Sequence, residues 1–214
     1  MEIVGDYEAK GYAQLKGLVD RRVAQALLQR VARDLGRTAL PFPGKASRPE
    51  ILKRPALQVY GGDYAPMQFF LWGITPLISR LVGRELLPTY DYFRVYRAGD
   101  ICRVHSDREA CEHSLSLALG YSDGRIWDLE IEESALASGP GAVEDDFSGQ
   151  KYASIGLQPG DALLYRGVDH RHGRTIPNPN RWSAHLFMHW VESDGPYRDQ
   201  AFDGIPPESK VSFG

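Results

Sequence analysis

Positions 112–121 read EHSLSLALGY, a stretch in which Leu115, Leu117 and Leu119 occupy every second position. Side chains that alternate in this way share one face of an extended strand, whereas a helix would space them three or four residues apart. Two further stretches, YDYFRVY at 90–96 and WSAHLFMHWV at 182–191, are rich in the aromatic and β-branched residues that strands favour. These stretches predict the central strands of a β-sheet.

Shorter stretches at 12–18, 125–132 and 162–165 bring the number of expected strands to at least six. A sheet with so many short strands favours a β-sandwich or a barrel. The segment 133–150 is rich in Gly, Ser and Asp and shows no period, so we expect a mobile loop there that could act as a lid.

Two helices are expected before most of these strands. The first follows the capping residue Asp20 and ends at Gly36. Its apolar stripe is formed by Val23, Leu27, Val31 and Leu35 and is widened by Ala24 and Leu28. The second begins at Pro66, and Pro76 is expected to kink or split it near Thr75, because a proline inside a helix cannot donate a backbone hydrogen bond. The segment 37–50, rich in Pro, Gly and Ser, is expected to be a loop.

The resulting expectation is a mainly β protein with N-terminal helices, in the α+β class. A chain of 214 residues fits a single domain. We divide it into a helical and strand support region at 1–88, a core at 89–193 that carries the 133–150 insertion, and a C-terminal tail at 194–214.

The composition excludes several classes of function. Lys and Arg total 25 against 28 Asp and Glu, so the net charge of −3 provides no basic field for nucleic acid. The apolar runs are too short to cross a bilayer, and the acidic N-terminus does not resemble a secretory signal. Two cysteines, Cys102 and Cys111, are too few for a disulfide scaffold. We therefore expect a cytoplasmic protein that binds neither nucleic acid nor membrane.

Five of the six histidines lie in or beside expected strands, and the pattern His105-Ser106-Asp107 is the most suggestive of them. On an extended backbone, His105 and Asp107 point to the same side and can converge on one point. A second histidine from a distant strand would complete two imidazoles and one carboxylate on one face of a metal, as in non-haem Fe(II) oxygenases. Taken alone, this short pattern also fits two polar residues in a turn.

The C-terminal part of the chain adds the context that the pattern needs. Gly167 opens a run, GVDHRHGR, that contains His170 and His172, and the triplet Arg181-Trp182-Ser183 follows. The H-x-D pattern, a distal histidine and the Arg181-Trp182-Ser183 triplet follow one another along residues 90–191. In this order of motifs the chain resembles the Fe(II)/2-oxoglutarate-dependent dioxygenases, most nearly their prolyl-hydroxylase-like branch. The resemblance implies a double-stranded β-helix, the jelly-roll or cupin-like core.

The resemblance also implies roles for individual residues. His105, Asp107 and His172 would hold Fe(II) as the catalytic centre, although His170 remains an alternative to His172. The cation that binds the distal carboxylate of 2-oxoglutarate would be Arg181, with Ser183 completing the motif; Arg174 remains an alternative to it. Tyr96 would hydrogen-bond the same cosubstrate.

Three further residues are candidates for lining a substrate pocket. Arg108 follows the expected ligand Asp107, His185 shares a strand face with Arg181, and Trp127 is an aromatic residue that could wall the cavity. The implied reaction hydroxylates a C–H bond of a small molecule, an amino acid or a peptide side chain, consuming O2 and releasing succinate and CO2. A metal-binding cupin with hydrolase or isomerase activity, or a non-catalytic jelly-roll binding module, would need no Arg181-Trp182-Ser183 motif.

Overall fold

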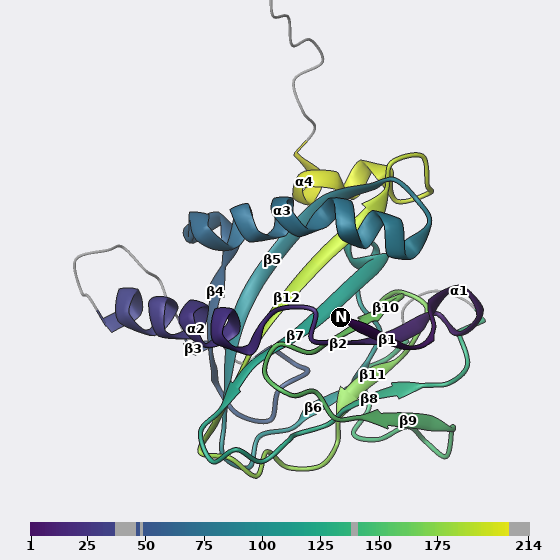
Figure 1. The fold of residues 1–214 in the computed structure, drawn as a ribbon. Coiled ribbons are helices and arrows are strands. Elements are labelled where there is room, and N and C mark those ends of the chain that lie inside the picture. The colour runs from purple at the N-terminus through teal and green to yellow at the C-terminus, as the bar shows by residue number, and fades with distance from the viewer. Residues whose placement is uncertain (37–45, 48, 138–140, 206–214) are drawn as a thin grey trace, which may run out of the picture.

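The computed structural model describes residues 1–36, 46–47, 49–137 and 141–205. Two antiparallel sheets lie face to face, and helices cover the outer side of the larger one (Figure 1). The protein is therefore mainly β with helices, as predicted.

The larger sheet has eight strands, and the smaller sheet has four. In spatial order, the larger contains β1 (Glu2–Asp6), β2 (Tyr12–Lys16), β10 (Ala162–Tyr165), β7 (His113–Tyr121), β12 (Trp182–Glu192), β5 (Leu86–Arg97), β4 (Ala56–Tyr60) and β3 (Ala46–Ser47). The smaller contains β6 (Cys102–His105), β11 (His172–Arg174), β8 (Leu129–Glu132) and β9 (Tyr152–Ile155). The helices are α1 (Tyr7–Lys10), α2 (Arg21–Gly36), α3 (Ala65–Val82) and α4 (Ala201–Gly204), with 3-10 turns η1 (Gly61–Asp63), η2 (Glu109–Cys111) and η3 (Arg198–Gln200).

The three stretches with the clearest period form neighbouring strands, β7, β12 and β5. Leu186 of β12 lies opposite both Leu117 of β7 and Phe93 of β5, and all three side chains belong to the main hydrophobic core. Residues of α2 and α3 complete this core, so one face of the sheet packs on the helices. The other face, turned toward the smaller sheet, holds the polar and aromatic positions of the same strands, which include Tyr92, Arg94, Tyr96, Ser114, Ser116, His185, Phe187 and His189.

Helix α2 begins where the sequence predicted, after Asp20, whose carboxylate accepts a hydrogen bond from the Arg22 amide at 2.8 Å. Most of the expected stripe packs on the core, since Val31 is buried and Leu27 and Leu35 are packed against it, but Val23 is 51% exposed. The stripe that packs on the sheet therefore starts at Ala24.

The prediction that Pro76 splits the second helix is wrong, because α3 is one continuous element with Pro76 inside it. Buried residues on both sides of the proline, Leu71 and Ile78, pack into the same core. Thr75 also donates a hydrogen bond to the Leu71 carbonyl at 2.7 Å and accepts one from the Trp190 indole at 2.8 Å. This packing offsets the one hydrogen bond that the proline removes.

The N-terminal segment contributes strands to the larger sheet as well as helices. β2 pairs with β10, and β4 pairs with β5. β3 lies inside the segment 37–50 that we expected to be a loop, and it pairs with β4. Residues 37–45 and 48 of that segment lie outside the described residues.

The described parts of 133–150 are mostly exposed but contact the smaller sheet at a few points. Glu144 forms a bridge with Val104 and an ion pair with Arg171 at 2.9 Å, and Phe147 is buried. The middle of the expected lid, residues 138–140, lies outside the described residues. Among the described helices, none has the length and apolar character needed to cross a membrane.

Truncating Leu117 to alanine should lower the free energy of unfolding by about 2–5 kcal/mol, because the residue is fully buried at the centre of the core. Val23→Ala on the exposed side of α2 should change it by less than about 0.5 kcal/mol. Urea unfolding followed by circular dichroism measures both. Equal losses for the two variants would contradict this assignment of the core.

Candidate metal centre

The two strands that carry the expected histidine ligands are antiparallel neighbours. β6 ends at His105, β11 begins at His172, and these two residues lie directly opposite each other. Asp107 follows β6 by two residues, and its carboxylate oxygens lie 3.7 Å from Nε2 of His105 and 3.6 Å from Nε2 of His172. All three ligand atoms lie within 4.8 Å of one another. Ligands about 2.0–2.2 Å from a shared ion are separated by about 3.0–3.5 Å, so a small contraction would close this site on a metal.

Backbone hydrogen bonds turn the coordinating nitrogen of each imidazole toward this point. Nδ1 of His105 donates to the Arg103 carbonyl at 2.7 Å, and Nδ1 of His172 donates to the His170 carbonyl at 3.0 Å. The lone pair of each Nε2 is then free for a metal. The pKa of each histidine is lowered to about 4, mainly by burial and, for His105, also by the proximity of His172. Both rings are therefore neutral at pH 7, as metal ligation requires.

Asp107 is fixed by its neighbours as well. Ser114 donates a hydrogen bond to Oδ2 of Asp107 at 3.2 Å and contacts Nδ1 of His189 at 2.9 Å. The Asp107 amide donates to the Gly167 carbonyl at 2.8 Å. A Cβ atom at Gly167 would lie 2.4 Å from Oδ2 of Asp107 and 2.6 Å from Oγ of Ser114, so only glycine leaves room for this carboxylate.

His170, the alternative to His172, points away from the cluster. Its Nδ1 donates to the Glu132 carbonyl at 2.9 Å, and its ring packs edge-on against Tyr12. A Cβ atom at Gly11 would lie 2.2 Å from its Nε2, so the far side of the ring meets the backbone of the N-terminal segment. The structure therefore brings His172, and not His170, to His105 and Asp107.

Arg174 lies two residues beyond His172 on β11 and is 1% exposed. Its guanidinium carbon lies 5.0 Å from the ring centroid of Trp127 and 5.8 Å from that of Tyr96. One terminal nitrogen is 3.5 Å from Nδ1 of His185, and its buried Nε has no hydrogen-bond partner among the described residues. Four candidates thus meet in one place: Arg174, Tyr96, Trp127 and His185.

Arg181 lies elsewhere, which corrects the expectation that it points into the barrel. Its side chain is 78% exposed, and its Nε is 3.2 Å from the carboxylate of Asp123, which also accepts its backbone N–H. Arg181 precedes the first residue of β12, so the alternation of that strand does not turn it inward. Ser183 is buried in the strand, where its hydroxyl donates to the side-chain oxygen of Asn178 at 2.8 Å.

Arg94 of β5 is a buried cation that the sequence analysis did not single out. Its guanidinium donates two hydrogen bonds to the side-chain oxygen of Gln58, at 2.6 and 2.9 Å, and one to the Tyr96 hydroxyl at 3.2 Å. Its position between Tyr92 and Tyr96, on the strand face opposite Phe93, was the signal that could have revealed it. Within the described part of the chain, no carboxylate forms an ion pair with Arg94 or Arg174.

Arg108 is half-exposed next to the triad. It forms an ion pair with Asp203 of α4 at 2.5 Å, and its guanidinium carbon lies 4.4 Å from the centroid of the Tyr90 ring. The residue after Asp107 is therefore tied to the C-terminal segment.

Replacing Gly167 with alanine should weaken binding of Fe(II), or of Mn(II) as a substitute, by about tenfold or more, because the added methyl group collides with Asp107 and Ser114. Isothermal titration calorimetry measures this affinity. Gly73→Ala is the control, because a Cβ there meets nothing within 4 Å and, as at Gly167, the backbone is not left-handed. Equal metal affinity of Gly167→Ala and the unmodified chain would show that Asp107 is not held as described.

No protein-family model matches the chain, and no curated protein sequence matches it. Solved structures do match. The α-ketoglutarate-dependent carbocyclase SnoK from nogalamycin biosynthesis has a TM-score of 0.66 at 13% identity, covering 95% of this chain and 91% of its own. The epimerase SnoN from the same biosynthesis has a TM-score of 0.63 at 14% identity, covering 96% and 88%. A prolyl-4-hydroxylase from Pseudomonas putida has a TM-score of 0.57 at 14% identity, covering 86% and 95%.

Two of the matching structures contain the groups that this chemistry uses. One structure of SnoN holds Fe3+, α-ketoglutarate and nogalamycin RO, and HygX from Streptomyces hygroscopicus holds nickel and 2-oxoglutarate. At these levels of identity the similarity is one of fold. The fold of this chain is the one found in solved 2-oxoglutarate-dependent oxygenases, as the resemblance in the sequence implied.

Proposed function

We propose that this protein is an Fe(II)- and 2-oxoglutarate-dependent oxygenase whose two sheets form a double-stranded β-helix. The observation that carries the proposal is the cluster of His105, Asp107 and His172, which offers two imidazoles and one carboxylate from one side. This donor set fits an iron ion, because both Nε2 lone pairs are free and Asp107 is held by Ser114. In SnoN and HygX, a metal and 2-oxoglutarate accompany the same fold.

Two buried cations suit a dianionic cosubstrate. We assign the far carboxylate of 2-oxoglutarate to Arg174, in place of the exposed Arg181. Residues two apart on a strand are separated by about 7 Å, which suits a five-carbon diacid that reaches from the metal at His172 to a guanidinium on the same strand. A carboxylate would supply the partner that the Arg174 Nε lacks among the described residues. Arg94 adds a second positive charge on the facing sheet.

The side chains around Arg174 would shape this cosubstrate site. Tyr96 accepts a hydrogen bond from Arg94, which leaves its own hydroxyl proton to donate to the cosubstrate. Trp127 stacks edge-on against Tyr96 with 5.0 Å between ring centroids and closes one wall. His185 lies beside both rings and is neutral, because burial and then Arg174 lower its pKa. Its Nε2 has no partner among the described residues, so it too is available to a ligand.

When bound, iron supplies the activation of O2 that is coupled to conversion of 2-oxoglutarate to succinate and CO2. The chain contributes geometry: the triad leaves one side open, the arginines orient the cosubstrate, and the aromatic walls exclude water. The proposed reaction inserts oxygen into a C–H bond of a small molecule, an amino acid or a peptide side chain. Neighbours of the same fold include an epimerase and a carbocyclase, so the products to be distinguished also include isomers and ring-closed molecules.

The purified chain, supplied with Fe(II), ascorbate and O2, should convert 2-oxoglutarate to succinate, measured by mass spectrometry. His172→Ala should abolish this conversion, while His170→Ala should retain it, since His170 faces Gly11 and not the triad. When candidate small molecules, amino acids or peptides are added, a product that gains one oxygen atom identifies a hydroxylase, one that loses two hydrogen atoms identifies another oxidation, and an isomer of unchanged mass identifies an epimerase. Metal binding without any succinate formation would instead favour a cupin-type hydrolase or isomerase, and absence of both would favour a binding module.

Arg174→Ala should weaken binding of 2-oxoglutarate about 30-fold or more, because it removes a buried charge-assisted pair, while metal affinity changes little. Arg181→Ala is a matched control: it removes the same charge from the surface and should change the affinity less than about threefold. The KM for 2-oxoglutarate and calorimetric titration of the metal-loaded protein report the effect. A larger loss for Arg181→Ala would return the anchor role to that residue.

A further inference from the structure

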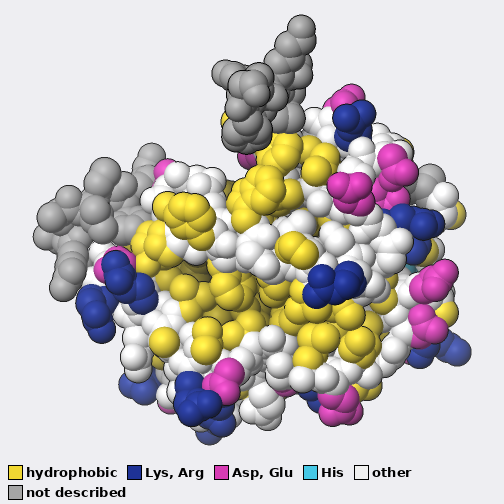
Figure 2. Space-filling model, turned by 45° about the horizontal axis from the view of Figure 1, so that its top comes forward, with side chains coloured by type: hydrophobic (Ala, Val, Ile, Leu, Met, Phe, Trp, Pro, Cys, Tyr) yellow, Lys and Arg dark blue, Asp and Glu magenta, His cyan; other side chains and the backbone are white. Residues whose placement is uncertain are grey.

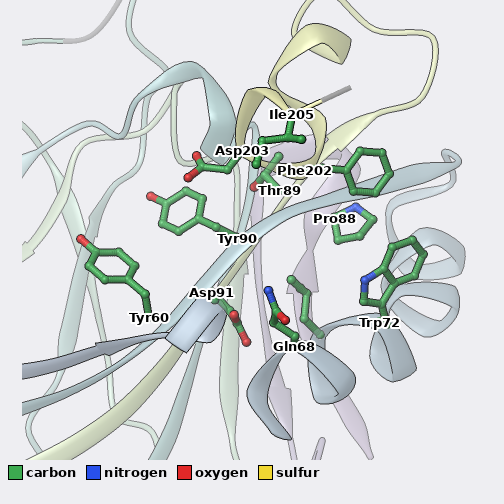
Figure 3. A pocket seen from close by; sticks show the side chains of 12 residues that line it. Tyr60, Gln68, Trp72, Pro88, Thr89, Tyr90, Asp91, Phe202, Asp203 and Ile205 are labelled. Atoms are coloured by element: carbon green, nitrogen blue, oxygen red, sulfur yellow. The ribbon is translucent and has the colours of Figure 1, made fainter. Parts of the chain in front are cut away.

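A second cavity lies outside the barrel, between α3, the first residues of β5 and the C-terminal segment (Figure 3). Its volume is about 430 Å³, within the range of small-molecule sites. Figure 2, in which this side of the molecule comes forward, shows hydrophobic side chains gathered on the surface. Trp72 and Ile205, which line the cavity, are both exposed.

One carboxyl group, that of Asp91, lies in the floor of this cavity. Asp91 is only 2% exposed, and its Oδ2 has no hydrogen-bond partner among the described residues. A Cβ atom at Gly61 would lie 1.6 Å from Oδ1, so glycine at that position makes room for the carboxyl group. Burial raises the pKa of Asp91 to about 7, and no charged side chain among the described residues lowers it. A ligand in the cavity would supply the partner that this buried oxygen lacks.

Four aromatic residues line the same cavity, Tyr60, Trp72, Tyr90 and Phe202. Trp72 and Phe202 are stacked, with 5.8 Å between their centroids and 16° between their planes. The faces of aromatic rings attract cations, and a carboxylate beside them adds a counter-ion. We propose that this cavity binds an organic ammonium group, with Asp91 as its counter-ion and the aromatic rings as its walls.

The other acid of the cavity, Asp203, is already neutralised, since it pairs with Arg108. Asp91 is therefore the carboxylate that remains for the ligand. Phe202 and Asp203 both adopt left-handed backbone conformations, with φ of 55° and 58°, which non-glycine residues rarely adopt. Backbone strain of this kind is often found at ligand sites, and both residues line the cavity.

The experiment uses the whole chain in the absence of 2-oxoglutarate. The probe is 2-phenylethylammonium, and its neutral analogue 2-phenylethanol is the comparison. Calorimetry and quenching of tryptophan fluorescence measure binding. The ammonium probe should bind at least about tenfold more tightly than the alcohol. Asp91→Asn, which keeps the shape but removes the charge, should abolish that preference. Asp199→Asn removes the same charge from an exposed site and should preserve it.

Trp72→Leu provides a second variant in case Asp91→Asn does not fold, because Trp72 is 54% exposed and its loss leaves the core intact. It should weaken binding of the ammonium probe more than binding of the alcohol. Nα-acetyl-lysine amide tests whether the ammonium group comes from a lysine side chain instead of a free amine. Binding of either ammonium compound that requires Asp91 supports the proposal. The proposal is overturned if neither ammonium compound binds, or if the Asp91→Asn chain binds them as tightly as the unmodified one.

This site does not depend on the proposed oxygenase activity. Amine binding is measured without metal turnover, so a chain that forms no succinate can still bind the ammonium probe. Conversely, loss of amine binding in Asp91→Asn leaves the His105, Asp107 and His172 cluster untouched, and the two proposals can fail separately.

Discussion

The close pairing of β6 with β11 is the constraint on which the metal centre depends. It sets His172 directly opposite His105, although the two strands are only four and three residues long. Gly173 permits this approach, because a Cβ atom there would lie 2.8 Å from the Cys102 carbonyl oxygen and 3.1 Å from the Val104 amide nitrogen. Any larger residue would push β11 from β6 and separate the histidines. The same pairing carries Arg174 into the interior, so one strand positions a ligand and a cation together.

The interior that results has an unusual balance of charge. Burying two guanidinium groups is costly unless their charge is compensated. Gln58 and the ring faces of Tyr96 and Trp127 compensate Arg94 and Arg174 in part, through hydrogen bonds and cation–π contacts. A bound dicarboxylate would complete the compensation in a region of low dielectric, where each charge pair is stronger than in water. The two arginines thus provide positive charge for an anionic ligand next to the His105, Asp107 and His172 cluster, which would bind a metal cation.

Much of the centre followed from local periodicity. The long strands β5, β7 and β12 were predicted from their alternation. The same argument predicted that His105 and Asp107 converge, although Asp107 lies two residues beyond the end of β6. The choice of His172 over His170 needed the orientation of β11, which the sequence left open. The expected inward orientation of Arg181 was not found, because this residue lies just before β12, where the strand alternation no longer applies. The short strands β6 and β11 exist through their pairing with each other and not through their own propensity, so no local pattern could predict them.

The second cavity could not be predicted from the sequence, because it joins residues that only the tertiary fold brings together, from η1, α3, β5 and α4. Side-chain contacts nevertheless connect it to the candidate metal centre. Tyr90 lines the cavity and stacks on His189 at 4.6 Å, while His189 contacts Ser114, which holds Asp107. On the solvent side, Arg108 links Asp203 of the cavity wall to the residue that follows Asp107. Two short chains of contacts therefore connect the cavity to one metal ligand. A ligand that shifts Tyr90 or breaks the Arg108–Asp203 pair would change the surroundings of Asp107. Both chains of contacts lead to Asp107, so the position of its carboxylate is the feature through which the cavity could affect the candidate metal centre.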